Sequence, residues 1–484
     1  MFTKVASGDY RCPAGLVIGV LALAGTTASL MQTLFIPVVP DLAAELGVRP
    51  EDASWLITIT LLAGAVATPS ISSLADMFGK RRMLLMSLAA LLVGSILGAL
   101  VTSLTLLIVA RALQGFAITL MPVAMSIMRD ELPRERLASA VALMSASLGI
   151  GSALGLILSG FVFVNFGWQT LFWVSAAMAL TMLLGVVATV PESPIRSGGR
   201  FDFPGAALLS GALLLLLLGI TKGGHWGWTS TTTLYSFLGS ALFFAAWVPW
   251  ELRNRQPIVD LRSTVRRPVL LTNFASYLAG FAMYVNLLAT TQVLQAPTST
   301  GYGFGMTVLQ AGIVLLPVAL VMMVVAPIAS AITKRFGARL TLIVGVTILA
   351  AGYLGRIFLM DSLWHVVLGS VIVSGGTILA FAAMPVLIMS SVPIDETAAA
   401  NGLNAVLRGT GMATSSAAVA ALLTGMTFVV GDSVYPTQAA FQYVYAAAAV
   451  GAILACAAAI GIPTRRHMSR EVVEYAEIVE SLGA

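Results

Sequence analysis

SSLADMFGKRR, residues Ser72 to Arg82, joins two long apolar stretches, and one apolar stretch later the chain reads RALQG, residues Arg111 to Gly115. The first segment combines a single acid with three basic residues, and the second places an arginine inside a hydrophobic helix. Because a charge at membrane depth must be neutralised by protein or water, such an arginine is rare and usually functional. These two segments predict a membrane protein that uses buried charge.

The composition supports a membrane protein. Of the 484 residues 58% are hydrophobic and only 10% are charged, whereas soluble domains carry about 25% charged residues. The first apolar run, 14–39, is too long for the core of a secretory signal and lacks a small-residue cleavage site, so we expect it to span the membrane. Two cysteines, and three histidines without metal-ligand spacing, predict no disulfide framework, metal site or bound cofactor. No phosphate-binding loop supports ATP hydrolysis.

The apolar runs divide the chain into spans of about 20 residues each. We expect fourteen spans, of which the seventh and eighth are the least distinct because the run 204–220 is short. They begin near Ala14, Ala53, Met83, Leu104, Leu137, Leu171, Pro204, Thr231, Val269, Val308, Leu340, Trp364, Ala398 and Ala439.

The basic residues predict the orientation of these spans. All but five of the 26 Lys and Arg residues fall in segments on one side of the predicted membrane. Arg49 and Lys222 lie in loops on the other side, and Arg111, Arg356 and Arg408 lie in spans. Since cytoplasmic segments carry the Lys and Arg excess, we expect both termini to be cytoplasmic.

The chain also contains a weak internal repeat. Residues 74–81 are echoed by 332–339, and 133–135 by 393–396, both at an offset of about 260 residues. That offset corresponds to six helices plus an inserted pair, and transporters built from parallel repeats bind substrate between their halves. The predicted parts are an N-terminal segment (1–13), a six-helix bundle (14–190), a linker (191–203), an inserted helix pair (204–250), a basic loop (251–268), a second six-helix bundle (269–462) and a cytoplasmic tail (463–484).

Together with the opening segments, several further motifs resemble the fourteen-spanner drug:proton antiporter family of the major facilitator superfamily. They are FDFPGA at 201–206, WELR at 250–253 with PIVDL at 257–261, and AGIVLLP at 311–317. The resemblance implies an all-α facilitator fold and a non-enzymatic, proton-driven exporter of small amphiphilic or hydrophobic compounds, such as antibiotics. It also implies a monomer in the cytoplasmic membrane, of bacterial type, whose partners are a small-molecule substrate and the lipid bilayer rather than nucleic acid.

The chain departs from the family pattern where proton coupling is concerned. The first helix reads LMQT at 30–33 where the family has a Leu-Asp-x-Thr pattern, so the aspartate is missing, and the fifth carries Leu156 in place of a central proline. All 21 carboxylates fall in loops, tails or helix ends. The remaining candidates for proton coupling are Asp41, Asp76, Arg111 and Asp130.

The resemblance implies a cytoplasmic gate at the first loop. Its candidate residues are Asp76, Gly79, Lys80, Arg81 and Arg82, with the acid pairing across the inner surface or capping a helix N-terminus. The alternative is a solvated charge cluster that only sets orientation.

Polar residues inside the spans are candidates for substrate binding. They are Gln32, Thr33, Arg111, Gln114, Tyr284, Asn286, Asn404 and Arg408. We expect Arg111 to face Gln32 and Thr33, with extension toward the headgroups as the alternative. For Arg408 the alternatives are a cavity position and a structural role. Arg356 is expected to reach the surface or pair locally with Asp361.

The sequence leaves two functions open. One is proton-driven efflux of amphiphilic compounds by alternating access. The other keeps the fold but carries neutral, anionic or lipid-like substrates without proton antiport, because arginines outnumber acids inside the spans. A membrane enzyme or sensor is disfavoured, since no catalytic constellation lies at membrane depth.

Overall fold

The computed structural model describes residues 14–463 except 36–37, 39–41, 43–44, 49, 54, 194–195, 197, 199, 255 and 431–432. Within these residues, fourteen helices are long and apolar enough to cross a membrane, as the sequence predicts. The N-terminal segment, Asp41 and the tail from residue 464 lie outside the described residues.

The helices of the first half form one bundle. They are α1 (Ala14–Thr33), α4 (Trp55–Phe78), α5 (Lys80–Leu100), α6 (Leu104–Gly115) continued by η2 (Phe116–Thr119) and α7 (Leu120–Glu131), α8 (Arg134–Phe166) and α9 (Trp168–Thr189). A single apolar core joins them, with fully buried side chains such as Leu34, Leu91 and Phe172. The short helix α3 (Pro50–Ala53) precedes α4.

The second half forms another bundle with its own cores around Val285, Tyr353 and Ala380. Its helices are α13 (Arg267–Gln295), α14 (Val308–Val314), α15 (Leu316–Phe336), α16 (Ala338–Phe358), α17 (Leu363–Met389), α18 (Thr397–Gly425) and α19 (Gln438–Ile460). The short elements are α12 (Leu261–Thr264), η3 (Thr298–Thr300), η4 (Ile394–Glu396) and the strands β1 (Thr427–Val430) and β2 (Ser433–Pro436). The strands pair antiparallel, with Thr427 opposite Pro436.

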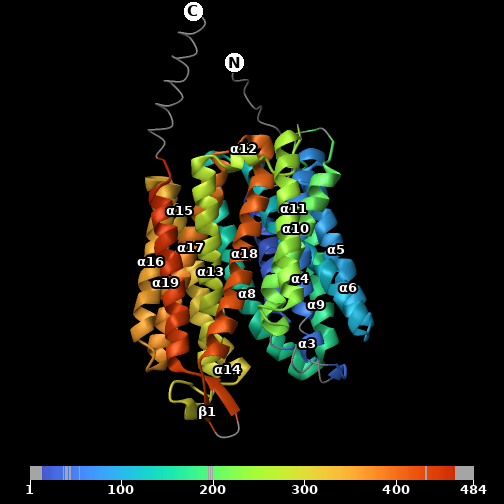
Figure 1. The fold of residues 1–484 in the computed structure, drawn as a ribbon. Helices are drawn as coiled ribbons and strands as arrows, with labels where there is room; N and C mark the ends of the chain where they lie inside the picture. Colours follow the sequence, from blue (N-terminus) through green and yellow to red (C-terminus); the bar gives the residue numbers. More distant parts are fainter. Residues whose placement is uncertain are drawn as a thin grey trace, which may run out of the picture.

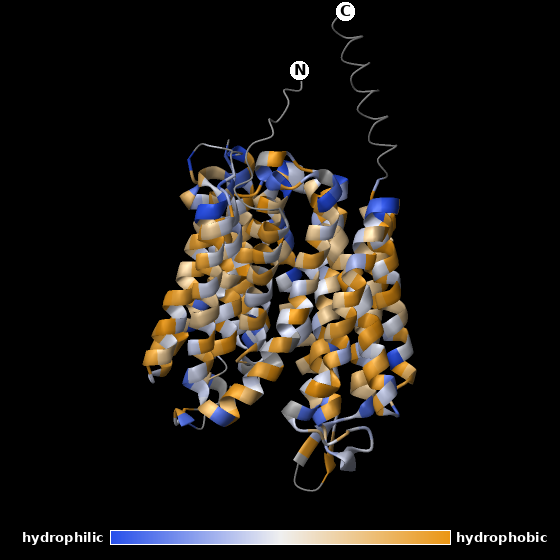
Figure 2. Cartoon of the chain, turned by 180° about the vertical axis from the view of Figure 1, so that it is seen from behind, coloured by the Kyte–Doolittle hydropathy of each residue, from blue (hydrophilic) through white to orange (hydrophobic). Residues whose placement is uncertain are grey.

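The two ends of the molecule are distinct. We call the end where α1 begins and α19 ends the terminal face, and the end that carries β1 and β2 the hairpin face (Figure 1). Hydrophilic residues gather at both ends, whereas the outer sides of the helices are mostly hydrophobic (Figure 2). Large apolar side chains such as Trp364, Leu100 and Phe161 are exposed there, as expected of a surface that faces lipid.

Helices α10 (Phe203–Trp226) and α11 (Thr231–Arg253) form the pair between the bundles in sequence. Helix α10 packs on both α4 and α18, so the pair covers the seam between the two bundles. Buried apolar contacts join Leu213 and Trp247 of the pair to Val406 of α18.

The boundary of the seventh span corrects the sequence analysis at Lys222. Helix α10 is 24 residues long, so Lys222 lies within it rather than in a loop. Its side chain is buried, and its ammonium nitrogen lies 4.5 Å from the centre of the Trp55 ring. The apolar stem and the aromatic contact allow this lysine to remain inside the helix packing.

Candidate functional site

A central cavity of about 170 Å³ lies between the two bundles. Its walls come from α1, α4, η2, α7 and α8 of the first bundle and α13, α17 and α18 of the second. Leu217 and Thr221 of α10 also line it, so the inserted pair closes the cavity at the α4–α18 seam. Membrane transporters of the repeat type hold substrate in such a position.

Four of the predicted substrate-binding residues line this cavity: Gln32, Thr33, Tyr284 and Arg408. Arg408 is the one charged residue among the described residues of the lining. The remaining wall is largely apolar, with a few hydroxyl groups, which is the usual character of a small-molecule site. Lining residues that the sequence analysis missed include Ile57, Leu61, Met121, Phe381 and Met412.

Arg408 reaches the cavity from the middle of α18. It lies eleven residues after Thr397, where α18 begins, which is about 16 Å along the helix axis. The guanidinium carbon is 5.0 Å from the centre of the Phe381 ring. One guanidinium nitrogen lies 4.0 Å from the sulfur of Met121, which is a weak acceptor.

Arg111 lies elsewhere, inside the first bundle, and its position corrects the expected contact with Gln32 and Thr33. Its Nε donates to the carbonyl of Leu56 (3.0 Å) and its Nη1 donates to Gln114 Oε1 (2.7 Å). Its guanidinium carbon lies 4.4 Å from the centre of the Phe35 ring. The side chain is 1% exposed, so it neither extends to the headgroups nor lines the central cavity.

Gln114 and Asn404 are also buried in helix packing. Gln114 donates from Nε2 to Ser95 Oγ (2.9 Å), which links α6 to α5. Asn404 donates from Nδ2 to Asn273 Oδ1 (2.9 Å), which links α18 to α13. Both side chains therefore satisfy buried polar groups between helices.

Arg356 differs from the sequence prediction as well. Instead of reaching the surface beside Asp361, it is 2% exposed and points into the second bundle. It donates to Asn286 Oδ1, and also to Thr290 Oγ1 and the Tyr445 hydroxyl, the last two at 2.8 Å. Asn286 in turn lines a smaller cavity of about 80 Å³ beside the central one.

The residues predicted to form a gate lie at the terminal face, where the two bundles touch. Asp76 is 3% exposed, and its Oδ2 accepts a hydrogen bond from the backbone nitrogen of Ala399 (2.8 Å) in the first turn of α18. A carboxylate at a helix N-terminus is stabilised by the free amides and by the helix dipole. Asp76, in the last turn of α4, therefore connects the first bundle to the second.

Lys80 supplies the counter-charge for this acid. Its ammonium group is fully buried, 3.5 Å from Asp76 Oδ1 and 2.5 Å from Asp130 Oδ2. Asp130 also accepts a hydrogen bond from Ser193 Oγ (2.5 Å). Two of the proton-coupling candidates, Asp76 and Asp130, thus share one buried cation.

The other predicted gating residues hold the loop in place. Arg81 donates through Nη2 to the carbonyl of Val187 (2.7 Å), and its backbone nitrogen donates to Glu192 Oε1 (3.3 Å). Arg82 is exposed and lies 3.8 Å from Glu192. Gly79 has a φ of 123°, which other residues adopt only with strain.

A second contact between the bundles was missed by the sequence analysis. Arg129, the residue before Asp130, donates to Thr397 Oγ1 and to the carbonyl of Val392 (3.3 Å). Its position in the charged RDELPRE segment, residues 129–135, was the available signal. This contact and the Asp76–Ala399 bond both hold the start of α18 to the first bundle.

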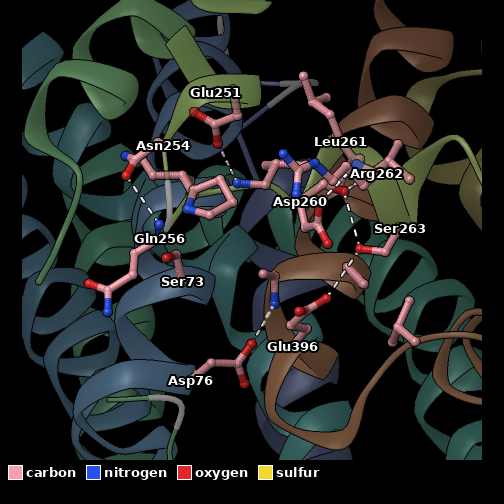
Figure 3. Close-up of a pocket in the computed structure, with 18 of the residues that line it drawn as sticks. Ser73, Asp76, Glu251, Asn254, Gln256, Asp260, Leu261, Arg262, Ser263 and Glu396 are labelled. Atoms are coloured by element: carbon pink, nitrogen blue, oxygen red, sulfur yellow. Dashed lines mark hydrogen bonds between the residues drawn. The ribbon is translucent and has the colours of Figure 1, made fainter. Parts of the chain in front are cut away.

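The loop after α11 lies over this junction and encloses a cavity of about 550 Å³ (Figure 3). Glu251 Oε1 accepts a hydrogen bond from the backbone nitrogen of Val259 (2.6 Å), and Ser263 Oγ donates to Glu396 Oε2 (3.1 Å). Helix α12 is thereby connected to η4, immediately before α18. The loop that follows the inserted pair therefore contacts the segment just before α18, next to the residues predicted to form a gate.

These features define a class: a multi-pass helical membrane protein with a largely apolar cavity between two bundles and a polar contact that joins the bundles at one end. The family model of the Major Facilitator Superfamily matches residues 21–416. The chain belongs to this superfamily, which is composed of transporters and not enzymes.

The chain is similar to drug-resistance proteins, one of which is named as an export protein. The chain is 30% identical over 339 residues to the tetracenomycin C resistance and export protein of Streptomyces glaucescens, covering 68% of this chain and 62% of that protein. It is 29% identical over 392 residues to the multidrug resistance protein Stp of Mycobacterium tuberculosis, covering 79% and 71% respectively. The chain thus spans less than two thirds of the first of these relatives.

Solved structures support the fold. The human organic anion transporter MFSD10 (TETRAN) superposes with a TM-score of 0.65 at 17% identity, covering 92% of this chain and all of that one. At this identity the likeness concerns the fold alone.

Proposed function

We propose that the protein exports small amphiphilic or hydrophobic compounds by alternating access, with the terminal face and both termini on the cytoplasmic side. The observation that carries the proposal is a central cavity between two bundles whose terminal ends are joined by Asp76 and Arg129. Opening these contacts while the opposite ends close would expose the same cavity to the other side. One relative is named as a resistance and export protein, which supports the direction of transport.

The proton gradient is the proposed energy source. Among the described carboxylates, Asp76 and Asp130 are the candidates, because both are buried at the gate and share Lys80. Protonation of either acid would weaken the ion pair that holds the loop, and so would couple a proton to gate opening.

A reconstituted system tests this function. Purified protein in proteoliposomes with an internal pH-sensitive dye is given a pH gradient and a panel of neutral, anionic and cationic amphiphiles. Substrate-dependent proton movement that is lost in Asp76→Asn, and kept in a matched surface variant Lys334→Gln, supports antiport. Failure of every amphiphile to move across the membrane contradicts the proposed export.

A second candidate is transport without proton antiport. The central cavity favours it, because its described lining holds one positive charge and no carboxylate. Movement of an amphiphile without proton movement in the same liposomes would support this candidate over the first.

A further inference from the structure

We propose that Arg408 forms an anion-binding subsite in the central cavity, so that the preferred cargo is an amphiphile with a carboxylate or sulfonate group. The inference rests on the proposed function, since it assumes that this cavity holds the substrate. It names the charge of the cargo, which the fold and the relatives leave open.

The first argument is a comparison of three arginines at membrane depth. Arg111 donates two hydrogen bonds to oxygen atoms, and Arg356 donates three. Among the described residues, the Arg408 guanidinium has one hydrogen-bond contact, at 4.0 Å from the sulfur of Met121, and it lies beside the Phe381 ring. A guanidinium carries five N–H donors. The protein thus satisfies two of its buried arginines internally and leaves the third with donors available on the cavity wall.

The second argument is charge. At the terminal face, Lys80 pairs with Asp76 and Asp130. The described residues around the cavity offer no carboxylate to Arg408. A charge that is removed from water without a partner is costly, and an anionic ligand would remove that cost. The same charge repels a cation at short range in a medium of low dielectric constant.

The third argument is the shape and polarity of the wall. The ring of Phe381 lies beside the guanidinium, 5.0 Å from its central carbon, and arginine packs favourably on aromatic rings. Met121, Met412 and Leu287 line the same cavity, and methionine side chains adapt to varied apolar shapes. The subsite therefore matches a ligand with one anionic group and an apolar body.

An anionic cargo also accounts for the missing acid in the cavity. A membrane potential that is negative inside drives a monovalent anion outward, by about 50-fold in concentration ratio per 100 mV. Export of such a cargo needs no proton site in the cavity. Arg408 would then replace the family's acid as the charge that determines what is carried.

Binding to matched probes tests the subsite. The probes are 8-anilino-1-naphthalenesulfonate and its uncharged analogue N-phenyl-1-naphthylamine, which share one aromatic body. Equilibrium dialysis uses the full chain in phosphatidylcholine nanodiscs, with empty nanodiscs as the blank. Charge-assisted hydrogen bonds predict that Arg408→Gln weakens sulfonate binding by about 10-fold or more. The uncharged probe should change less than about twofold, since its contacts are apolar.

Two further variants keep the result interpretable. Arg408→Lys retains the charge and should bind the sulfonate more tightly than Arg408→Gln. Arg335→Gln removes a positive charge from the exposed end of α15 and should bind both probes like the wild type. Equal loss of both probes in Arg408→Gln, or unchanged binding of the sulfonate in a folded Arg408→Gln, overturns the proposal.

Two further experiments test whether the bound anion is a lipid or a soluble compound, and whether the bound compound is transported. Phosphatidylglycerol in the nanodiscs should compete with the sulfonate in an Arg408-dependent manner if the occupant is a lipid, and should not if it is a soluble amphiphile. Uptake of the two probes into liposomes under a potassium diffusion potential then tests transport. Selective binding without transport would leave the subsite intact and refute the export function, whereas transport of the uncharged probe alone would refute the subsite.

Discussion

The loop after α4 and the loop after α15 occupy equivalent places in the two repeats and have a similar backbone conformation. Each follows a phenylalanine at a helix end, Phe78 or Phe336, and each turns on a glycine with positive φ. The φ values are 123° at Gly79 and 87° at Gly337. The same chain reversal is therefore built twice.

One side-chain contact is also shared. Arg81 donates to the carbonyl of Val187 near the end of α9, and Arg339 donates to the carbonyl of Ile460 at the end of α19. Carbonyls in the last turn of a helix lack partners within the helix, and basic side chains satisfy them. The glycine and the arginine thus form a structural unit that both bundles use.

The two loops differ at the position of the acid. Asp76 is buried and bonds to Ala399 of the other bundle, whereas the matching residue Lys334 is exposed. Lys80 is buried between two acids, and the matching residue is Ala338. The repeated segment therefore contains two sets of residues. The glycine and the arginine, present in both repeats, build the loop. Asp76 and Lys80, present only in the first repeat, join the two halves.

The largest effect is expected from Lys80→Met. This change leaves Asp76 and Asp130 buried without their shared cation, and removing one partner of a buried ion pair costs about 3–5 kcal/mol. The free energy of unfolding in mixed micelles measures the loss. The matched control is Lys334→Met in the second loop, which is exposed and should change stability by less than about 0.5 kcal/mol. Similar losses in both variants would contradict the distinction between the loops.

The next largest effect is expected at the gate itself, from Asp76→Asn. The amide still fits the site but accepts the hydrogen bond of Ala399 without a charge, which weakens it by about 1–2 kcal/mol. Hydrogen exchange of the Ala399 amide should therefore accelerate about 5- to 30-fold. Mass spectrometry of peptides from the start of α18 measures this without knowledge of the substrate. In Lys334→Gln the same peptides should exchange as in the wild type, and faster exchange there would argue against a specific gate.

Alanine substitutions at the two glycines sharpen the comparison further. Positive φ costs an L-residue about 1–2 kcal/mol at either site. At Gly79 an added Cβ would also lie 2.6 Å from Glu192 Oε1, whereas at Gly337 it meets nothing within 4 Å. Because Glu192 must then give up its bond to the Arg81 nitrogen, Gly79→Ala should cost about 1 kcal/mol more than Gly337→Ala. Thermal unfolding of the two variants under identical conditions measures this difference, and equal costs would count against it.

The fold could be predicted because hydropathy records it directly. Fourteen apolar stretches became fourteen candidate spans, since a chain in lipid must satisfy its backbone within helices. The exception at Lys222 is instructive: a charged residue ended the predicted span early, although its stem and the Trp55 ring keep it inside α10. A hydropathy scale scores the charge of Lys222 but contains no information about the Trp55 ring that packs against it.

The site could be predicted only in part, because depth in a span does not say which way a side chain points. Arg408 reaches the central cavity and Arg111 does not, although both are arginines within hydrophobic helices. The partners of Arg356 lie 70 and 89 residues away, at Asn286 and Tyr445. Contacts at such separations follow from how the helices pack, which a single sequence does not record.

The smallest expected effect concerns the contact that both loops share. Arg81→Gln removes one hydrogen bond to a carbonyl at a helix end, and Arg339→Gln removes the matching bond to Ile460 together with a longer one, 3.4 Å, from its Nε to the carbonyl of Ala459. The longer bond is at the limit of hydrogen-bond distance and contributes little. Each change should cost about 0.5–1.5 kcal/mol, and the two costs should agree within about 0.5 kcal/mol. Paired unfolding measurements test this equality. A much larger cost at Arg81 would mean that the hydrogen bond from its backbone nitrogen to Glu192 depends on the arginine side chain. Arg81 would then belong with Asp76 and Lys80 to the residues that join the two halves at the proposed gate.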